Sequence, residues 1–331
     1  MPRSGPSSND ARTEKRSPPR IGIVGAGRSR QGIGPYHADA FEAAGARVTA
    51  VSGRDPASAQ RAAQAVAARL RHPVAAADDA LALARSVDAL VVASPHASHL
   101  EGLDAALAAG VPCLCEKPLV SWPDAPAGLA RIRQFEDRNL LLDENCQWPF
   151  VLPALFGLHP ALEGAPIRSV VMGLGPGASG PAMVADSLSH ILSVVQQLVV
   201  LGPETAIASL RQSNAARDAE VNVVAFDLRD TRAAIAMELH LRRWPEQPRP
   251  AWIAVNGLRI DRRIGPDYSQ SFAAPDGRAM NVRDPLHQLV YRFVAQLEAK
   301  DRERIAAIAS SVALRLRLYA DILRGLAGDR N

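Results

Sequence analysis

Residues 20–27 read RIGIVGAG, a short apolar run that ends in glycines. Residues 35–44, which follow, have the apolar spacing of a helix, so the glycines lie between a strand and a helix. A dinucleotide-binding fold carries its phosphate loop at this position, where glycines give a tight turn and the helix N-terminus offers amide donors. The stretch therefore predicts an α/β domain that binds a dinucleotide.

The glycine loop departs from the usual three-glycine pattern. An arginine stands where the third glycine belongs, and two further glycines follow, as if about four residues had been inserted. The alternative is a glycine-rich turn without a ligand. The residues that we expect to contact the cofactor in this loop are Gly25, Gly27, Arg28, Gly32 and Gly34.

The rest of the chain shows two patterns of predicted secondary structure. Up to residue 148, β-rich runs such as 47–52 and 89–93 alternate with helical stretches such as 55–70, which predicts an α/β Rossmann domain over 20–148. Beyond it, successive strand-like runs have no long helix between most of them. We therefore expect a C-terminal α+β domain over 149–331 with a largely antiparallel open sheet, one long helix from about 186 to 200, and a helical end.

Composition limits the classes of function. The chain of 331 residues is 47% hydrophobic and 22% charged, as in soluble globular proteins. Its net charge of +4 is scattered and only 5% of residues are aromatic, so we expect no nucleic-acid partner. Three cysteines give neither a disulfide framework nor a zinc pattern, and no metal is predicted. Residues 1–19 lack a secretion signal and are predicted to be a disordered tail; with no membrane span, we expect a cytoplasmic protein.

The end of the second predicted strand bears on cofactor choice. Residues 51–55 read VSGRD, with no carboxylate before Asp55 to bond a ribose hydroxyl. Ser52 and Arg54 instead offer a hydroxyl and a planar cation suited to a phosphate, so NADP is favoured over NAD. If Asp55 only caps the next helix and Arg54 is solvated, the specificity stays open.

Lys117 is an unusual choice of cation in this chain. Of 38 lysines and arginines, only Lys15, Lys117 and Lys300 are lysines, and Lys117 ends the apolar run in CLCEKPLV (113–120). Lysine can give up a proton where its pKa is lowered, whereas arginine effectively never does. The alternative is an ordinary surface salt bridge.

Three motifs together resemble the Gfo/Idh/MocA family of oxidoreductases: SPHASH at 94–99, EKP at 116–118 and ADSLSH at 185–190. The family carries a (T/S)-P-x-x-x-H loop, an E-K-P motif and a D-x-G-x-H helix start. Leu188 replaces the glycine of the last motif, and ENCQWP at 144–149 lacks the usual arginine. The resemblance implies that Lys117 faces the nicotinamide and the substrate, where we expect partial burial to lower its pKa. The further cofactor-loop residues that it implies are Ser94, Pro95, His96, His99 and Glu116, with His99 equally able to cap the following helix.

Asp186 and His190 lie four residues apart and therefore share a helix face. With the resemblance, His190 is the expected acid/base that takes a hydroxyl proton, and Asp186 binds a neighbouring hydroxyl or orients the imidazole. The alternatives are a pair of metal ligands, or a helix-capping aspartate beside a core histidine. Gln147 and Trp148 either line the sugar-binding face or belong to a domain junction.

The leading hypothesis is an NADP-dependent, or NAD-dependent, oxidoreductase of a sugar- or polyol-like small molecule, with Lys117 and His190 as proton-transfer groups. One alternative is redox-neutral elimination or hydrolysis of a glycoside with retained NAD. Another is a non-catalytic cofactor-binding sensor. The open second sheet, as in the resembled family, favours a homo-oligomer, either dimer or tetramer.

Overall fold

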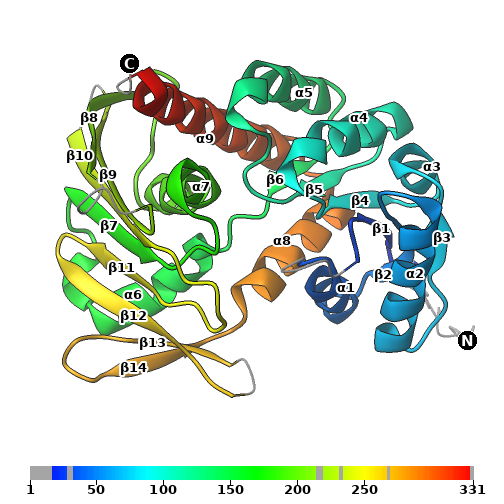
Figure 1. Ribbon diagram of the computed structural model, residues 1–331, viewed down its shortest axis with the longest axis horizontal. Coiled ribbons are helices and arrows are strands. Elements are labelled where there is room, and N and C mark those ends of the chain that lie inside the picture. Colours follow the sequence, from blue (N-terminus) through cyan, green and yellow to red (C-terminus); the bar gives the residue numbers. More distant parts are fainter. Residues whose placement is uncertain (1–16, 28–32, 214–218, 231–233, 267–268, 329–331) are drawn as a thin grey trace, which may run out of the picture.

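The structure, a computed structural model, describes residues 17–27, 33–213, 219–230, 234–266 and 269–328. The predictions made for Arg28, Gly32 and most of the 1–19 tail therefore lie outside the described residues. Figure 1 shows two sheets side by side, with helices around the first and a bundle of helices between them.

The first sheet has six parallel strands in the order β3-β2-β1-β4-β5-β6. This is the doubly wound Rossmann order, as predicted from the alternation of strand and helix. Its central strand β4 reads ALVV and is buried throughout, as expected where helices cover both faces of a parallel sheet. The strands are β1 Arg20–Val24, β2 Arg47–Ser52, β3 Ala75–Ala77, β4 Ala89–Val92, β5 Cys113–Cys115 and β6 Leu142–Glu144.

The helices around this sheet begin at recognisable signals. Helix α2 has Asp55 as its N-cap, whose side chain accepts a hydrogen bond of 2.7 Å from the Ser58 amide, and Pro56 follows. The other elements of this region are α1 Gly34–Ala43, α2 Pro56–Leu70, α3 Ala80–Arg85, η1 His96–Ser98, α4 His99–Ala109, η2 Trp122–Asp124 and α5 Ala125–Asp137.

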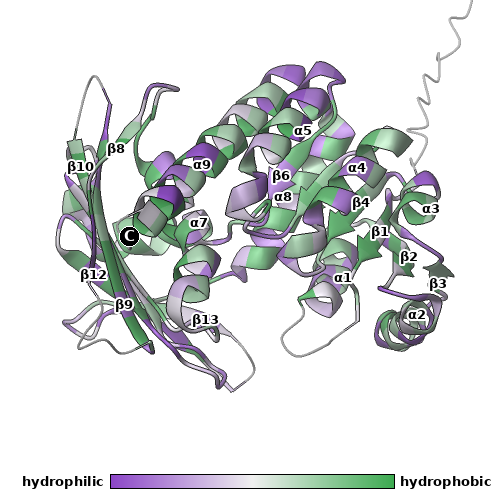
Figure 2. Ribbon diagram, turned by 45° about the horizontal axis from the view of Figure 1, so that its top comes forward, coloured by the Kyte–Doolittle hydropathy of each residue, from purple (hydrophilic) through white to green (hydrophobic). Residues whose placement is uncertain are grey.

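The second sheet has eight strands in the order β14-β13-β12-β11-β7-β10-β9-β8. Only β7 and β10 pair in parallel, so the sheet is largely antiparallel, as predicted. Helices α7 and α9 pack on one face of it (Figures 1 and 2). The strands are β7 Ser169–Leu174, β8 Ala206–Ser213, β9 Val221–Arg229, β10 Ala234–Arg242, β11 Ala251–Val255, β12 Leu258–Ile264, β13 Gln270–Ala273 and β14 Ala279–Val282. The helices of this part are η3 Trp148–Val151, α6 Leu152–Leu158, η4 Pro160–Leu162 and α7 Gly180–Leu198, followed by α8 Pro285–Ala299 and α9 Arg302–Gly328.

Helix α7 begins earlier than the sequence predicted. The expected start near residue 186 is wrong, because Gly180 and Pro181 open the helix, with proline in the first turn, where it costs no hydrogen bond. Asp186 therefore lies in the second turn and is not an N-cap. This removes the alternative in which Asp186 only caps the helix.

The last two helices connect the two halves. By sequence α8 follows the second sheet, yet its apolar side chains join the core of the first, where Phe293 meets Phe41 edge-on with ring centroids 6.0 Å apart. Helix α9 contacts β6 and α5 on one side and α7 and β8 on the other. In the described part of the chain, no helix is long and apolar enough to cross a membrane.

Candidate active site

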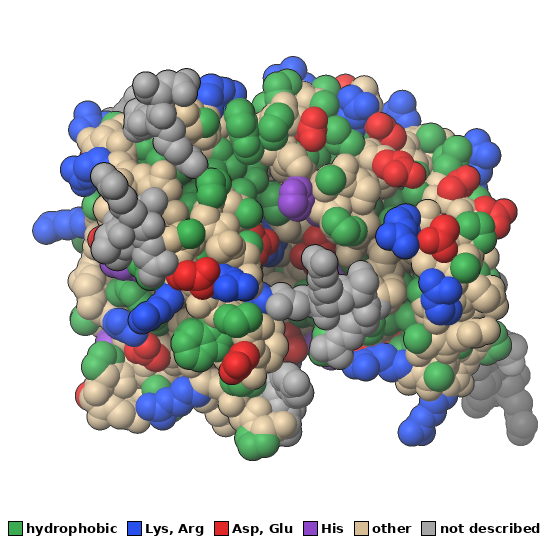
Figure 3. Space-filling view, viewed as in Figure 1, with side chains coloured by type: hydrophobic (Ala, Val, Ile, Leu, Met, Phe, Trp, Pro, Cys, Tyr) green, Lys and Arg blue, Asp and Glu red, His purple; other side chains and the backbone are tan. Residues whose placement is uncertain are grey.

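Lys117 joins the two halves of the molecule. It follows β5, so it lies at the carboxyl edge of the first sheet, where open parallel sheets bind ligands. Its Nζ donates a 2.8 Å hydrogen bond to Asp186 Oδ1 on α7 and a 2.9 Å bond to the Asp186 backbone oxygen. Figure 3 shows the surface hollowed between the two halves, with charged side chains inside the hollow.

The charge state of Lys117 differs from the expectation. Burial alone would lower the pKa of Lys117, but the charge and hydrogen bond of Asp186, with the charge of Glu116, raise it above its usual value. Burial would likewise raise the pKa of Asp186, but Lys117 holds it below the usual range. The prediction that burial lowers the Lys117 pKa is therefore wrong, because the carboxylate that faces Lys117 lies 69 positions further along the chain and no local pattern indicates it. The site holds an ammonium.

His190 lies one helical turn beyond Asp186 on the same helix. Its Nδ1 is buried and has no hydrogen-bond partner among the described residues. Burial, together with the charges of Lys117 and Arg262, lowers the pKa of His190 to about 3, although Asp186 opposes the shift. The imidazole is therefore neutral near pH 7 and has a ring nitrogen able to accept a proton.

Glu116, expected to contact the cofactor, makes its hydrogen bonds with other side chains of the protein. Its carboxylate lies 2.7 Å from Nε2 of His37 on α1 and accepts a hydrogen bond from the Asn145 amide. Burial would raise the pKa of Glu116, but these two bonds and the charge of Lys117 keep it below its usual range. The cofactor contact predicted for Glu116 stays untested; the bonds shown fix the EKP segment to the helix after the glycine loop.

The SPHASH segment (94–99) is held in place by a buried histidine ring. The His99 ring is buried, with Nδ1 3.0 Å from the Pro118 oxygen and Nε2 2.8 Å from the Ser94 oxygen. It therefore connects the start of α4 with the segment that carries Lys117. Ser94 Oγ accepts a hydrogen bond of 2.8 Å from Ser98, and His96 is exposed beside Pro95.

The described part of the glycine loop fits a dinucleotide. Gly25 has a φ of +82°, and a Cβ there would lie 2.7 Å from the backbone of Ser94, so only glycine is accommodated. A Cβ on Gly34 would lie 2.7 Å from Ala26, whereas a Cβ on Gly27 would make only an ordinary contact of 3.9 Å with Ala62. Among the described residues no side chain caps the N-terminus of α1, and the positive end of a helix dipole at this place favours a phosphate.

At the end of β2, the two residues proposed to contact the cofactor ribose differ in exposure. The Ser52 hydroxyl is buried without a hydrogen-bond partner among the described residues. The Arg54 side chain is 89% exposed, with Nε 3.5 Å from Asp55. Asp55 caps α2, as the alternative interpretation had it.

Trp148 is buried at the junction of the two halves. Its ring packs edge-on against Phe272 at 6.0 Å, and the Arg262 guanidinium lies 5.8 Å from the ring centroid. Gln147 donates a 3.3 Å hydrogen bond to Asn145. Both residues thus lie near the site, with the indole in the core.

Comparison with known proteins agrees with this arrangement. Residues 19–138 match the family described as "Oxidoreductase family, NAD-binding Rossmann fold". The chain belongs to the Gfo/Idh/MocA family.

Relatives of the family cover different parts of the chain. An inositol 2-dehydrogenase of Streptomyces avermitilis is 34% identical over 209 residues, which are 58% of this chain and 56% of that protein. A UDP-N-acetylglucosamine 3-dehydrogenase of Acidithiobacillus ferrooxidans is 33% identical over 147 residues, 44% of this chain and 42% of that protein. The chain thus spans about half the length of the curated relatives it matches.

A solved structure extends the likeness to nearly the whole chain. The inositol dehydrogenase homolog of Azotobacter vinelandii, complexed with NADH and myo-inositol, has a TM-score of 0.68 and 17% identity, covering 96% of this chain and 97% of that one. At this identity the likeness shows the fold: a Gfo/Idh/MocA arrangement of both sheets.

Several residues of this Gfo/Idh/MocA site were missed from the sequence. His37, Asn145 and Arg249 gave no usable signal. Arg262 did, because β12 reads LRIDRRI, and the alternate positions 258, 260, 262 and 264 are Leu, Ile, Arg and Ile. An arginine in the apolar row of a strand is a buried cation, and such residues are kept where something pairs with them.

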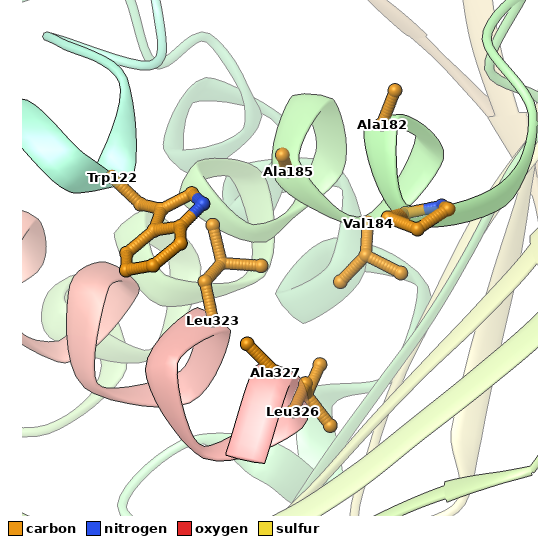
Figure 4. A pocket seen from close by; sticks show the side chains of 8 residues that line it. Trp122, Ala182, Val184, Ala185, Leu323, Leu326 and Ala327 are labelled. Carbon is orange, nitrogen blue, oxygen red and sulfur yellow. The ribbon is translucent and has the colours of Figure 1, made fainter. Parts of the chain in front are cut away.

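A separate pocket lies between α7, α9 and η2 (Figure 4). It has a volume of about 400 Å³ and is lined by Trp122, Pro181, Ala182, Val184, Ala185, Leu323, Leu326 and Ala327. Its lining offers no ionisable side chain, unlike the surroundings of Lys117.

Proposed function

We propose that the protein is an NAD(P)-dependent oxidoreductase that transfers hydride between the nicotinamide and a hydroxyl or ketone carbon of a sugar- or polyol-like substrate. The observation that carries the proposal is the convergence of Lys117 from the first half with Asp186 and His190 from the second. Membership of the Gfo/Idh/MocA family supports it, as do the relatives, whose names are those of dehydrogenases acting on a polyol and a nucleotide sugar.

The proton is handled by residues of this chain. When bound, the nicotinamide takes up hydride from the carbon or returns it. In the oxidation, the neutral His190 ring accepts the hydroxyl proton as the carbon–oxygen double bond forms. The Lys117 ammonium donates a hydrogen bond to the reacting oxygen and stabilises the negative charge that grows there. Asp186 holds Lys117 at its position. The reduction uses the same steps in reverse.

We further propose that NADP is preferred. The carboxylate nearest the end of β2, Asp55, is engaged in capping α2, and the exposed Arg54 needs to leave only its 3.5 Å contact with Asp55 to turn toward a 2′-phosphate. Nicotinamide fluorescence titrated with NADPH and with NADH tests this. We expect NADPH to bind at least tenfold more tightly, about 1.4 kcal/mol. Arg54→Gln should lose that difference, and Arg85→Gln, an exposed arginine on α3, should keep it. Equal affinity in the wild type would leave the oxidoreductase standing and remove the preference.

Turnover tests the activity itself. With the preferred oxidised cofactor bound, a panel of polyols and sugars should include at least one that produces the absorbance band of the reduced nicotinamide. His190→Asn should abolish that production while the cofactor still binds. A folded protein that carries no retained cofactor and binds neither dinucleotide would overturn the proposal. Cofactor binding with no turnover on any compound would favour a sensor.

A further inference from the structure

The site contains more positive than negative charge among the described residues. The charges of Lys117 and Arg249 act on Asp186, and those of Lys117 and Arg262 act on His190. Two carboxylates, Asp186 and Glu116, act on Lys117 in return. The charge of Arg249 also acts on Arg262, and both partly buried guanidinium groups lose hydration. An excess of partly buried cations is costly unless something anionic offsets it.

Arg262 is the most unusual member of this group. It lies opposite Phe272 in the pairing of β12 with β13, on the same face as the fully buried Ile260. Its Nη2 donates a 2.7 Å hydrogen bond to the Arg249 backbone oxygen, while its Nε is buried without a partner among the described residues. An arginine that only stabilised the sheet would be expected to place all its donors on protein acceptors.

Arg262 lies near the residue proposed to accept the proton. Its guanidinium stands 5.8 Å from the Trp148 ring, and its charge reaches His190. It thus lies beside Trp148 and within electrostatic range of the imidazole. A substrate held between Lys117 and His190 would extend toward it.

We propose that Arg262, together with Lys117 and Arg249, binds an anionic group of the substrate, a carboxylate or a phosphate. The inference rests on the proposed function, because it names the class of substrate that the same site takes. The planar guanidinium suits either group, since it offers two parallel donors to a pair of oxygens. A neutral polyol would offer the buried Nε–H of Arg262, which has no partner among the described residues, no charged acceptor.

The bound anion would also change the chemistry beside it. Burial and the neighbouring Arg249 lower the pKa of Arg262 to about 10, which shows how poorly this place supports an uncompensated cation. An anion would offset the charges that depress the pKa of His190 and make its imidazole a stronger base. The anionic substrate thus helps to prepare its own proton acceptor.

Calorimetry with matched probes tests the inference. The wild type, with and without saturating NADH, is titrated with D-glucose, D-glucuronate and D-glucose 6-phosphate, and with the corresponding D-galactose series. We expect at least one acid or phosphate to bind tenfold or more tightly than its neutral partner. Whether the uronate or the phosphate does so tells which anionic group the site binds. The tighter binding should weaken as salt is raised, because it depends on charge.

Two variants separate recognition from folding. Arg262→Gln should remove the preference for the anionic probe, and Arg262→Lys should keep part of it, with NADH affinity unchanged in both. Arg263→Gln is the matched control, because the neighbouring side chain on β12 is exposed on the other face. It should behave as the wild type does.

The outcomes distinguish this inference from the proposed function. If anionic and neutral probes bind equally, if no anionic probe binds in either state, or if Arg262→Gln weakens all ligands alike, the inference is overturned. If NADH does not bind but the anionic preference is present and depends on Arg262, the proposed oxidoreductase fails and the anion site stands.

Discussion

At the scale of single residues, Lys117 shows what a motif can and cannot predict. The EKP sequence located a lysine at the edge of the first sheet, and ADSLSH located Asp186 and His190. The charge of Lys117 could not be predicted, because it depends on a hydrogen bond to a residue 69 positions away. The same contact keeps the lysine charged, and it is the reason why we propose His190 rather than Lys117 as the proton acceptor.

Replacing Lys117 tests the need for a compact ammonium donor at the reacting oxygen. Lys117→Arg preserves a cation that can pair with Asp186, but a planar guanidinium does not fit the point contact at 2.8 Å. We expect turnover to fall by about a hundredfold or more with cofactor affinity little changed. Lys300→Arg, at the end of α8, is the control. Steady-state kinetics at saturating cofactor measures both, and a Lys117→Arg enzyme with wild-type turnover would show that the ammonium of Lys117 is not required.

The lowered pKa of His190 makes a prediction about stability. In the folded protein its pKa is about 3, against about 6.5 in the unfolded chain. Below pH 6.5 the unfolded state binds a proton that the folded state does not, so this contribution is fully present above pH 6.5 and is lost as the pH falls toward 3. Between pH 7.5 and pH 5 the loss should be about 2 kcal/mol.

Urea unfolding of His190→Asn at these two pH values measures that contribution. The variant should lose about that much less stability than the wild type as the pH drops, because asparagine does not titrate. His287→Asn, exposed on α8, should show the wild-type dependence. If both variants keep the same dependence as the wild type, the His190 imidazole is not the source.

At the scale of elements, periodicity predicted most of the strands and helices. The buried face of each element is apolar, so apolar residues recur along the sequence with the period of that element. The start of α7 was missed since Gly180 and Pro181 resemble the glycine- and proline-rich loop before them. The role of Glu144 was also invisible. It ends β6 in a segment where only a departure from the family pattern had been noticed.

Glu144 is the centre of a buried polar cluster that holds several elements together. Its Oε1 accepts hydrogen bonds of 3.0 Å from the Leu119 amide and 3.2 Å from Ser189, and Oε2 lies 2.5 Å from Arg315 Nε on α9. Leu119 is two residues from Lys117, and Ser189 immediately precedes His190. The carboxylate therefore helps to hold the segments of Lys117 and His190 relative to each other.

Breaking this cluster should be costly. Arg315→Met leaves the Glu144 carboxylate buried without its cation, and we expect a loss of about 3–5 kcal/mol in the free energy of unfolding. Arg324→Met, which removes a surface pair with Asp321, should change it by less than about 0.5 kcal/mol. Adding Glu144→Leu to Arg315→Met should recover part of the loss. Urea unfolding checks all three variants, and additive losses in the double variant would contradict the coupling.

At the scale of the whole molecule, the sequence predicted two sheets of different kinds. It did not predict which sheet each of the last two helices packs against. Helix α8 joins the core of the first sheet after the second has been completed, because its apolar face complements α1. Helix α9 then contacts both halves. Such packing depends on shape rather than on any local pattern, so it had to be seen in three dimensions.

The second sheet leaves one large face for association, which we propose is used by a homo-oligomer. On the face of β7, β9 and β10 away from α7 there is no described helix (Figure 2), and β10 exposes Ala236 there. A symmetric dimer places the same surface on both partners, so a charge added near its centre meets its own copy or close neighbours. Light scattering should show a dimer or tetramer for the wild type and a shift to monomer for Ala236→Arg. Ala68→Arg, on the exposed side of α2, should leave the assembly intact, and a wild type that is monomeric at micromolar concentration would show that this face is not an interface.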